Sequence, residues 1–142
     1  MKNILVLIDF TDITDNVLNH GRLWSKSFGA KCWLMHVAAP DPEFVGYEIG
    51  PKYIRDDRSK VLQQEHRDLT AMKKTMESDG VDCEALLVQG YVNETILDEI
   101  KRLNIDVIIM GNKRHGKLYE VVVGSVGREI LRNAEVPVVV VP

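Results

Sequence analysis

Short β-rich apolar runs alternate with segments of helical period along this 142-residue chain, and this alternation limits the fold more than any other feature. The first run is continuously apolar, which is typical of a strand buried on both faces of a parallel sheet. Parallel neighbours need crossovers, and right-handed crossovers place helices on both faces. We therefore expect an α/β fold, a doubly wound five-stranded parallel sheet with strand order 3-2-1-4-5. The expected strands are Asn3–Ile8, Lys31–Val37, Asp82–Val88, Asp106–Met110 and Val136–Val141.

The segments between these runs predict four helices, two of them with a side-chain N-cap. Thr14 is the expected N-cap of the first helix and Gly29 its end, while Asn93 is the expected N-cap of the third. The third helix should bury a stripe formed by Ile96, Leu97, Ile100 and Leu103. The other two helices are expected at residues 52–79 and 125–133.

Nothing in the chain indicates a second domain, so residues 1–142 are expected to form a single one. Residues 38–51 hold three prolines and no periodicity, and we expect this long loop to border the ligand crevice. A net charge of −3 gives no general attraction to nucleic acid or anionic membrane, and neither is an expected partner. The apolar run ending at Asp9 is too short for a signal peptide or a membrane span.

The two cysteines, Cys32 and Cys83, each lie in an apolar strand-like segment. This placement predicts buried free thiols in a reducing compartment, and hence a cytoplasmic protein. The four histidines show no spacing typical of metal ligands, so no metal site is expected.

A glycine-rich segment, Gly111 to Gly116, follows the fourth strand, and Gly124-Ser125 then opens the fourth helix. A strand that leads into a glycine-rich turn and a helix N-terminus is a common phosphate site, because backbone N–H groups and the helix dipole favour an anion. With the expected strand order, this segment should face residues 9–12 across a crevice at the carboxyl ends of the strands. Asp9 could then accept hydrogen bonds from a ribose or an adenine, above an apolar floor of Val37 and Met110.

Each of these residues also has a purely structural explanation. Asp9 could cap the turn that follows it, and Gly111 could be a steric requirement of the packing between a strand and a loop. Gly124-Ser125 could be an ordinary helix start. Only their convergence at one crevice favours the functional reading.

The chain resembles the universal stress proteins of the UspA family over its whole length. The segments that carry the resemblance are Ile4–Asp9, Leu34–Val37, Asp106–Gly111, Gly124–Val126 and Val136–Val141. The resemblance implies that Asp9 and the backbone at Val37 contact the adenosine of ATP or AMP, with or without Mg²⁺. It also implies that Gly111, Gly124, Ser125 and Val126 hold the ribose and phosphates.

The sequence departs from the nucleotide-binding members of this family at Arg114, where they have a second glycine; here the glycine is displaced to Gly116. If the glycine is needed for close approach to phosphate, Arg114 blocks binding. Arginine could instead grip the phosphates as part of a cationic lid with its basic neighbours. A solvated basic loop is the third reading.

Two functions therefore compete. The first is an ATP or AMP sensor in the stress response. It would have no catalytic residues and would at most hydrolyse ATP slowly. The second is a dimeric interaction protein that binds no nucleotide. In both, the apolar edge Val138, Val139, Val140 and Val141 needs a cover, and the resemblance implies a homodimer through this last strand.

Overall fold

The computed structural model describes residues 1–38, 52–112 and 124–142, apart from the side chains of 52–58. Within these residues, parallel strands form one five-stranded sheet in the order β3-β2-β1-β4-β5, which confirms the predicted fold class and strand order. The strand ends lie within one or two residues of those predicted. The elements are β1 (Asn3–Leu7), α1 (Thr14–Phe28), β2 (Lys31–Ala38), α2 (Lys52–Ser78), β3 (Cys83–Gln89), α3 (Val92–Arg102), β4 (Val107–Gly111), α4 (Ser125–Asn133) and β5 (Val138–Val141).

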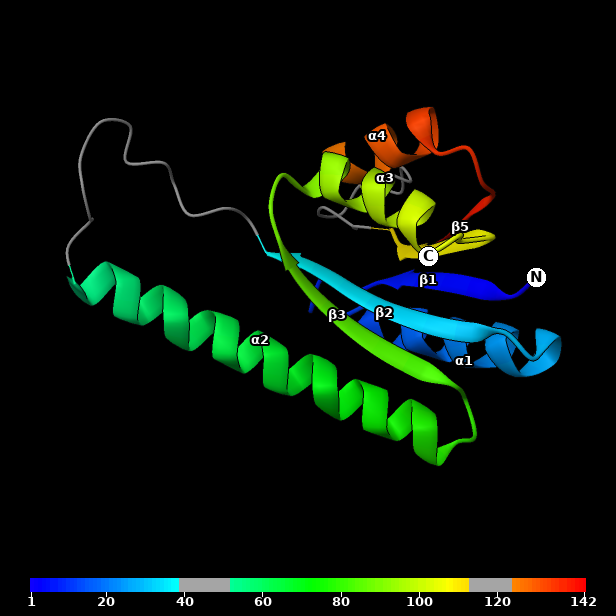
Figure 1. Ribbon diagram of the computed structural model, residues 1–142, viewed down its shortest axis with the longest axis horizontal. Helices are drawn as coiled ribbons and strands as arrows, with labels where there is room; N and C mark the ends of the chain where they lie inside the picture. The colour runs from blue at the N-terminus through cyan, green and yellow to red at the C-terminus, as the bar shows by residue number, and fades with distance from the viewer. Residues whose placement is uncertain (39–51, 113–123) are drawn as a thin grey trace.

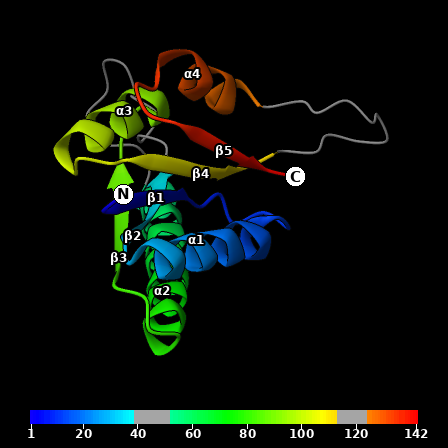
Figure 2. The same ribbon diagram turned by 90° about the vertical axis from the view of Figure 1, so that its right-hand side faces the viewer.

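Helices cover both faces of the sheet, as predicted (Figures 1 and 2). α1 and α2 pack on one face, and α3 and α4 pack on the other. Side chains of the central strand β1 alternate between these two cores: Ile4 and Val6 face the α1/α2 side, and Leu5 faces the α3/α4 side. All three side chains are fully buried, which explains why β1 is apolar on both faces from Ile4 to Val6.

The ends of the helices agree only partly with the predictions. Gly29 ends α1 in the left-handed conformation, with φ 61°, as expected. Both predicted side-chain N-caps are wrong: α1 begins at Thr14 itself, and α3 begins at Val92, so that Asn93 lies inside its first turn. Thr14 is 6% exposed at the first position of α1, where it lines the groove between α1 and α2.

The predicted stripe of α3 is confirmed. Ile96 and Ile100 are buried in the core on the α3/α4 face, and Leu97 and Leu103 pack against it. This stripe covers the sheet beside the carboxyl ends of β1 and β2.

Cys32 and Cys83 are free and buried, as predicted. The structure adds that they are direct partners in the register between β2 and β3. Cys83 donates its thiol proton to Cys32, and this hydrogen bond together with burial raises the pKa of Cys83 far above that of an ordinary thiol. Cys83 is therefore an unreactive core residue at neutral pH.

Asp106 joins the two central strands at their amino ends. Its Oδ2 accepts hydrogen bonds from the backbone N–H groups of Lys2, at 2.6 Å, and Asn3, at 2.9 Å. These bonds lower the pKa of the Asp106 carboxyl, because they favour its charged form. The carboxylate thus links the residue before β4 to the start of β1.

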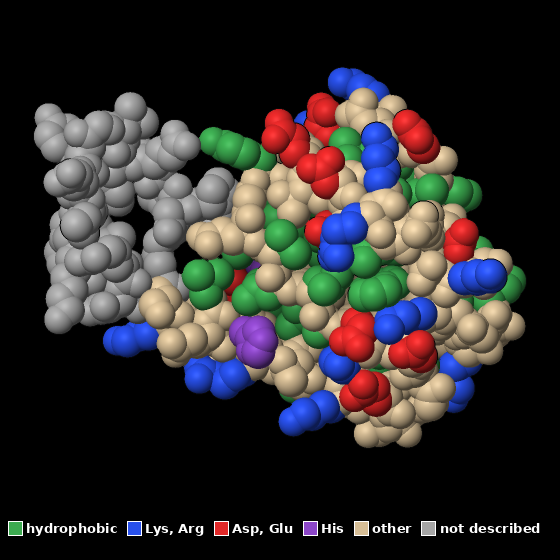
Figure 3. Space-filling view, in the orientation of Figure 1, with side chains coloured by type: hydrophobic (Ala, Val, Ile, Leu, Met, Phe, Trp, Pro, Cys, Tyr) green, Lys and Arg blue, Asp and Glu red, His purple; other side chains and the backbone are tan. Residues whose placement is uncertain are grey.

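The described surface mixes charges of both signs. On the face shown in Figure 3, acidic and basic side chains lie interspersed among apolar ones. None of the helices in the described ranges is long and apolar enough to cross a membrane.

Candidate functional site

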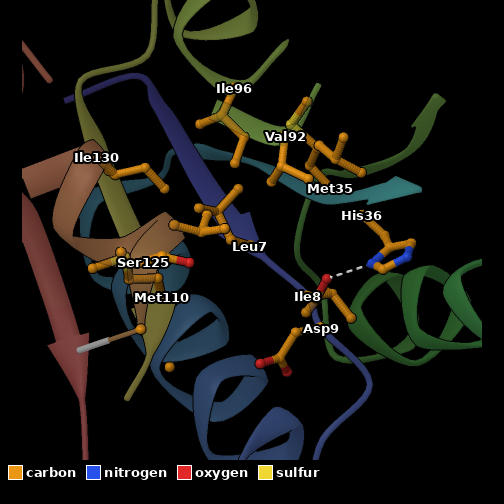
Figure 4. Close-up of a pocket in the computed structure, with 15 residues that line it drawn as sticks. Leu7, Ile8, Asp9, Met35, His36, Val92, Ile96, Met110, Ser125 and Ile130 are labelled. Atoms are coloured by element: carbon orange, nitrogen blue, oxygen red, sulfur yellow. Dashed lines mark hydrogen bonds between the residues drawn. The ribbon is translucent and has the colours of Figure 1, made fainter. Parts of the chain in front are cut away.

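A pocket of about 430 Å³ lies at the carboxyl ends of β1, β2 and β4, where α3 and the start of α4 close it (Figure 4). This is the place where a doubly wound sheet opens a crevice, because the connections from β1 and β4 leave on opposite faces. The predicted site residues that border the pocket are Asp9, Val37, Met110, Gly111, Gly124, Ser125 and Val126. Arg114 and Gly116, and the loop at 39–51, lie outside the described residues.

The floor of the pocket is apolar and belongs to the α3/α4 side of the sheet. Leu7, Met35 and Met110 supply it from three neighbouring strands. Ile96 of α3 and Ile130 of α4 cover it from the side, as Figure 4 shows. Of the apolar lining, the sequence predicts Val37 and Met110; Ile96 is predicted only as part of the buried stripe of its helix.

Asp9 lies at the rim of the pocket and is exposed. Its Oδ1 accepts hydrogen bonds from the backbone N–H of Thr11, at 3.2 Å, and from the Thr11 hydroxyl, at 2.7 Å. The structural explanation of Asp9 as a turn cap is therefore confirmed. Both of these bonds end on one oxygen, which leaves Oδ2 to accept a hydrogen bond from a ligand.

The other residues of the segment 9–12 do not border the pocket. Phe10 adopts a left-handed conformation, with φ 56°, and the chain turns away there. Phe10, Thr11 and Asp12 line a second groove of about 760 Å³ between α1 and α2. The prediction that residues 9–12 face the crevice as a unit is wrong for these three, because the turn at Phe10 directs them to the other face of the sheet.

Gly111 borders the pocket, but a side chain at this position would project from the opposite face of the sheet, toward α1. A Cβ at this position would lie 2.7 Å from Cγ2 of Ile13 and 3.2 Å from Cγ2 of Val17. The alternation along β4 agrees, because Met110 faces α3/α4 and the next residue must face α1. Close packing of β4 against Ile13, in the loop before α1, and against Val17 of α1 therefore accounts for this glycine. A structural explanation of Gly111 is thus sufficient.

The amino end of α4 supplies the polar side of the pocket. Gly124 precedes the helix, and the first amide that bonds within α4 is that of Arg128, to the Gly124 carbonyl at 3.0 Å. The amides of Ser125, Val126 and Gly127 precede it, and all three residues border the pocket. Amides that have no partner within their own helix, at the positive end of the helix dipole, attract an anion.

His36 borders the pocket on its β2 side. Its Nδ1 lies 2.7 Å from the carbonyl oxygen of Ile8, the bond drawn in Figure 4. His36 and Asp9 are the titratable side chains among the described lining residues, and none of these residues is a lysine or arginine. No three His, Cys, Asp or Glu side chains gather to hold a metal ion within the parts of the chain that the structure describes.

The arrangement can therefore hold a flat apolar group on the floor, a hydrogen-bond donor at Asp9 and an anion at α4. These are the parts of a mononucleotide: a base, a ribose and a phosphate. The residues described here offer binding groups rather than a nucleophile with an adjacent base.

The model of the universal stress protein family matches this chain over residues 1–142. Universal stress protein MJ0531 of Methanocaldococcus jannaschii is 27% identical over 141 residues, which cover 99% of this chain and 81% of the relative. The solved structure of MJ0577 from the same organism has a TM-score of 0.80 at 25% identity, covering 99% of this chain and 94% of that one. An Arabidopsis thaliana protein of the family, solved with AMP bound, has the same fold, with a TM-score of 0.64 at 21% identity and coverage of 99% and 91%.

Proposed function

The chain belongs to the universal stress protein family, and on that premise we propose that the pocket at its strand ends binds an adenine nucleotide, ATP or AMP. One observation carries the proposal: Asp9, the apolar floor and the opening of α4 border one cavity of about 430 Å³. That volume lies within the range of pockets for small ligands. The AMP-bound structure of a relative with this fold supports the same ligand class.

The three parts of the nucleotide have distinct positions in this proposal. The base lies on the floor formed by Val37 and Met110, and a ribose hydroxyl donates to Oδ2 of Asp9. The phosphates accept from the amides of Ser125 and Val126, which lie at the start of α4. Any Mg²⁺ would arrive with the phosphates of ATP. Arg114 and Gly116 belong to the same proposal, with Arg114 gripping the phosphates rather than blocking them.

We further propose that the protein acts as a cytoplasmic stress-response sensor and as a homodimer. β5 is an edge strand of apolar residues, and such an edge needs a cover. A second copy paired through β5 supplies it. Light scattering at micromolar concentration tests this part, and a monomer would contradict it.

Calorimetric titration with AMP and with ATP, each with and without Mg²⁺, tests the nucleotide site. Asp9→Asn keeps an oxygen that can accept from Thr11 but removes the charge. We expect a loss of affinity of about tenfold or more, the effect of removing a hydrogen bond to a charged group. Gly124→Val should also weaken binding, because it places a branched side chain beside the α4 amides.

Asp12→Asn is the matched control, since it makes the same chemical change at a residue of the α1/α2 groove. Its affinity should equal that of the wild type. Absence of binding at millimolar nucleotide would overturn the proposal and leave the second function, a dimeric interaction protein without a ligand.

A further inference from the structure

The ring of His36 lies between two oxygen acceptors. Its Nδ1 is 2.7 Å from the carbonyl oxygen of Ile8, and its Nε2 is 3.4 Å from Oε1 of Glu65 on α2. The ring thus connects the end of β1 to a helix on the α1/α2 face. Figure 4 shows the first of these contacts at the edge of the pocket.

The chemistry of the two acceptors determines where the hydrogens on the ring must be. A carbonyl oxygen carries no hydrogen, so Nδ1 of His36 must donate to Ile8. A neutral imidazole has only one N–H, and its Nε2 would then direct a lone pair at the carboxylate of Glu65. Only the protonated ring donates in both directions.

We propose that a proton on His36 fastens the turn at residues 8–10 to α2, and that the pocket holds its ligand more tightly in this state. The part that concerns the ligand rests on the proposed nucleotide site. The fastening itself does not, because it is a property of the protein without a ligand. His36 is then a positioning residue that makes the site sensitive to pH.

The turn that His36 holds is the one that presents Asp9. Phe10 adopts its left-handed conformation there, an uncommon backbone geometry for a residue other than glycine. Its ring packs on that of His36, with the centroids 4.6 Å apart. The hydrogen bond to Ile8 and the contact with Phe10 thus flank Asp9 on both sides in the sequence. A shift of the His36 ring would move the turn and the carboxylate at the rim of the pocket.

Among the described residues, Glu65 is the carboxylate that faces His36. The two side chains are 15% and 23% exposed, and Oε2 of Glu65 is buried with no partner among the described residues. The neighbour of His36 on β3 is the apolar Leu87. Asp9, on the β1 side, is held by Thr11, and Asp68, one turn along α2, is bonded to Gln64. Without a proton on His36, the carboxylate of Glu65 would remain half-buried opposite a lone pair.

Histidine is the side chain that ordinarily exchanges its proton between pH 5 and 8. In the folded protein a charged ring can donate to both Ile8 and Glu65, whereas a neutral ring donates to Ile8 alone. Loss of the proton should therefore loosen the turn that carries Asp9.

The first experiment uses the protein without nucleotide and compares the wild type with Glu65→Gln. A glutamine at 65 can donate to the lone pair of a neutral His36, so this variant suits the uncharged ring. Nitrogen NMR of the imidazole should show that His36 loses its proton at a higher pH in the wild type than in Glu65→Gln. Glu77→Gln, on the same helix and beside Lys73, is the control and should leave His36 unchanged.

Urea unfolding supplies a second measure of the fastening. From pH 6 to pH 8, the folding equilibrium constant of the wild type should fall about fivefold relative to that of Glu65→Gln, the size expected of a favourable ion pair. Equal titration of His36 in both proteins, or a neutral ring at pH 6 in the wild type, would overturn the proposal.

The second experiment titrates AMP into both proteins at pH 6 and pH 8. Phosphate protonation affects both titrations equally, so it cancels in the comparison. The wild type should lose about fivefold more affinity than Glu65→Gln as the pH rises. An equal loss would overturn the coupling to the pocket. Absence of AMP binding to either protein at any pH would overturn the nucleotide site and this coupling, while the NMR result would still decide the fastening.

Discussion

Replacing Gly111 by alanine tests the conclusion that α1 packing, rather than a ligand, accounts for this glycine. The added Cβ would lie 2.7 Å from Cγ2 of Ile13, whereas carbon atoms in favourable contact are about 3.5–4.0 Å apart. Ile13 is β-branched, so its Cγ2 cannot rotate away without a change of rotamer. Val17, the next nearest side chain at 3.2 Å, is 1% exposed and belongs to the core on the α1/α2 face.

The magnitude follows from two opposing effects. Overpacking a tight site costs about 1–3 kcal/mol. Alanine also restricts the unfolded chain more than glycine does, which returns about 0.4–1 kcal/mol. We therefore expect Gly111→Ala to lower the free energy of unfolding by about 1–2 kcal/mol.

Urea unfolding of four proteins forms the assay: the wild type, Gly111→Ala, Ile13→Ala and the double variant. Ile13→Ala removes the obstructing Cγ2, so the double variant should be more stable than the sum of the two single effects by about 1 kcal/mol. Gly29→Ala is the control. Its Cβ would meet no atom within 4 Å, and its cost arises from φ 61° alone, so Ile13→Ala should not relieve it. A wild-type midpoint for Gly111→Ala, or strict additivity in the double variant, would refute the packing argument.

Two further predictions concern stability. Asp106→Asn should remove a contribution that is present at neutral pH; because the folded pKa of Asp106 is lowered, this contribution exists above the ordinary aspartate pKa of about 3.9 and disappears as the pH falls through the folded value. Urea midpoints of both proteins from pH 7 to pH 3 should therefore converge at the acid end, and a constant difference would argue against the carboxylate. Ile108→Ala, at a fully buried position, should cost about 2–5 kcal/mol, whereas Leu23→Ala, at a residue 60% exposed, should stay within about 0.5 kcal/mol in the same assay. Similar costs for the two would contradict the assigned cores.

The architecture was predictable because its signals are repeated along the chain. Each strand combines an apolar run with a change of the hydrophobic period on either side. An error of one or two residues at the end of a strand does not change the order of the strands in the sheet. The N-cap predictions were wrong for the opposite reason, because each depends on a single residue. Thr14 and Asn93 both have the right chemistry for a cap, but a single residue cannot reveal where packing against the sheet will start the helix.

The candidate site was predictable at its strand ends and less so elsewhere. Asp9 follows one buried strand and Gly111 ends another, so the topology alone brings them to one edge. The turn at Phe10 could not be foreseen, because a left-handed conformation at phenylalanine has no local sequence signal. The contact of His36 with Glu65 joins residues 29 positions apart on different elements, and no motif relates them. The same holds for the facing thiols Cys32 and Cys83, whose register depends on two separate strands.

The central position of β1 has a consequence for the order in which the protein can assemble. β1 pairs with β2, which follows it closely, and on its other side with β4, about a hundred residues later in the chain. During synthesis, β1 to β3 can form a three-stranded sheet while the outer edge of β1 still lacks its neighbour. That edge leaves backbone N–H and C=O groups of the segment Ile4 to Val6 without the strand that pairs with them in the finished fold. The pocket needs β1, β2, β4 and α4 together, so it exists only once the last third of the chain has joined the first. A ligand of this pocket would therefore select the completed molecule and add nothing to the stability of its partly made forms.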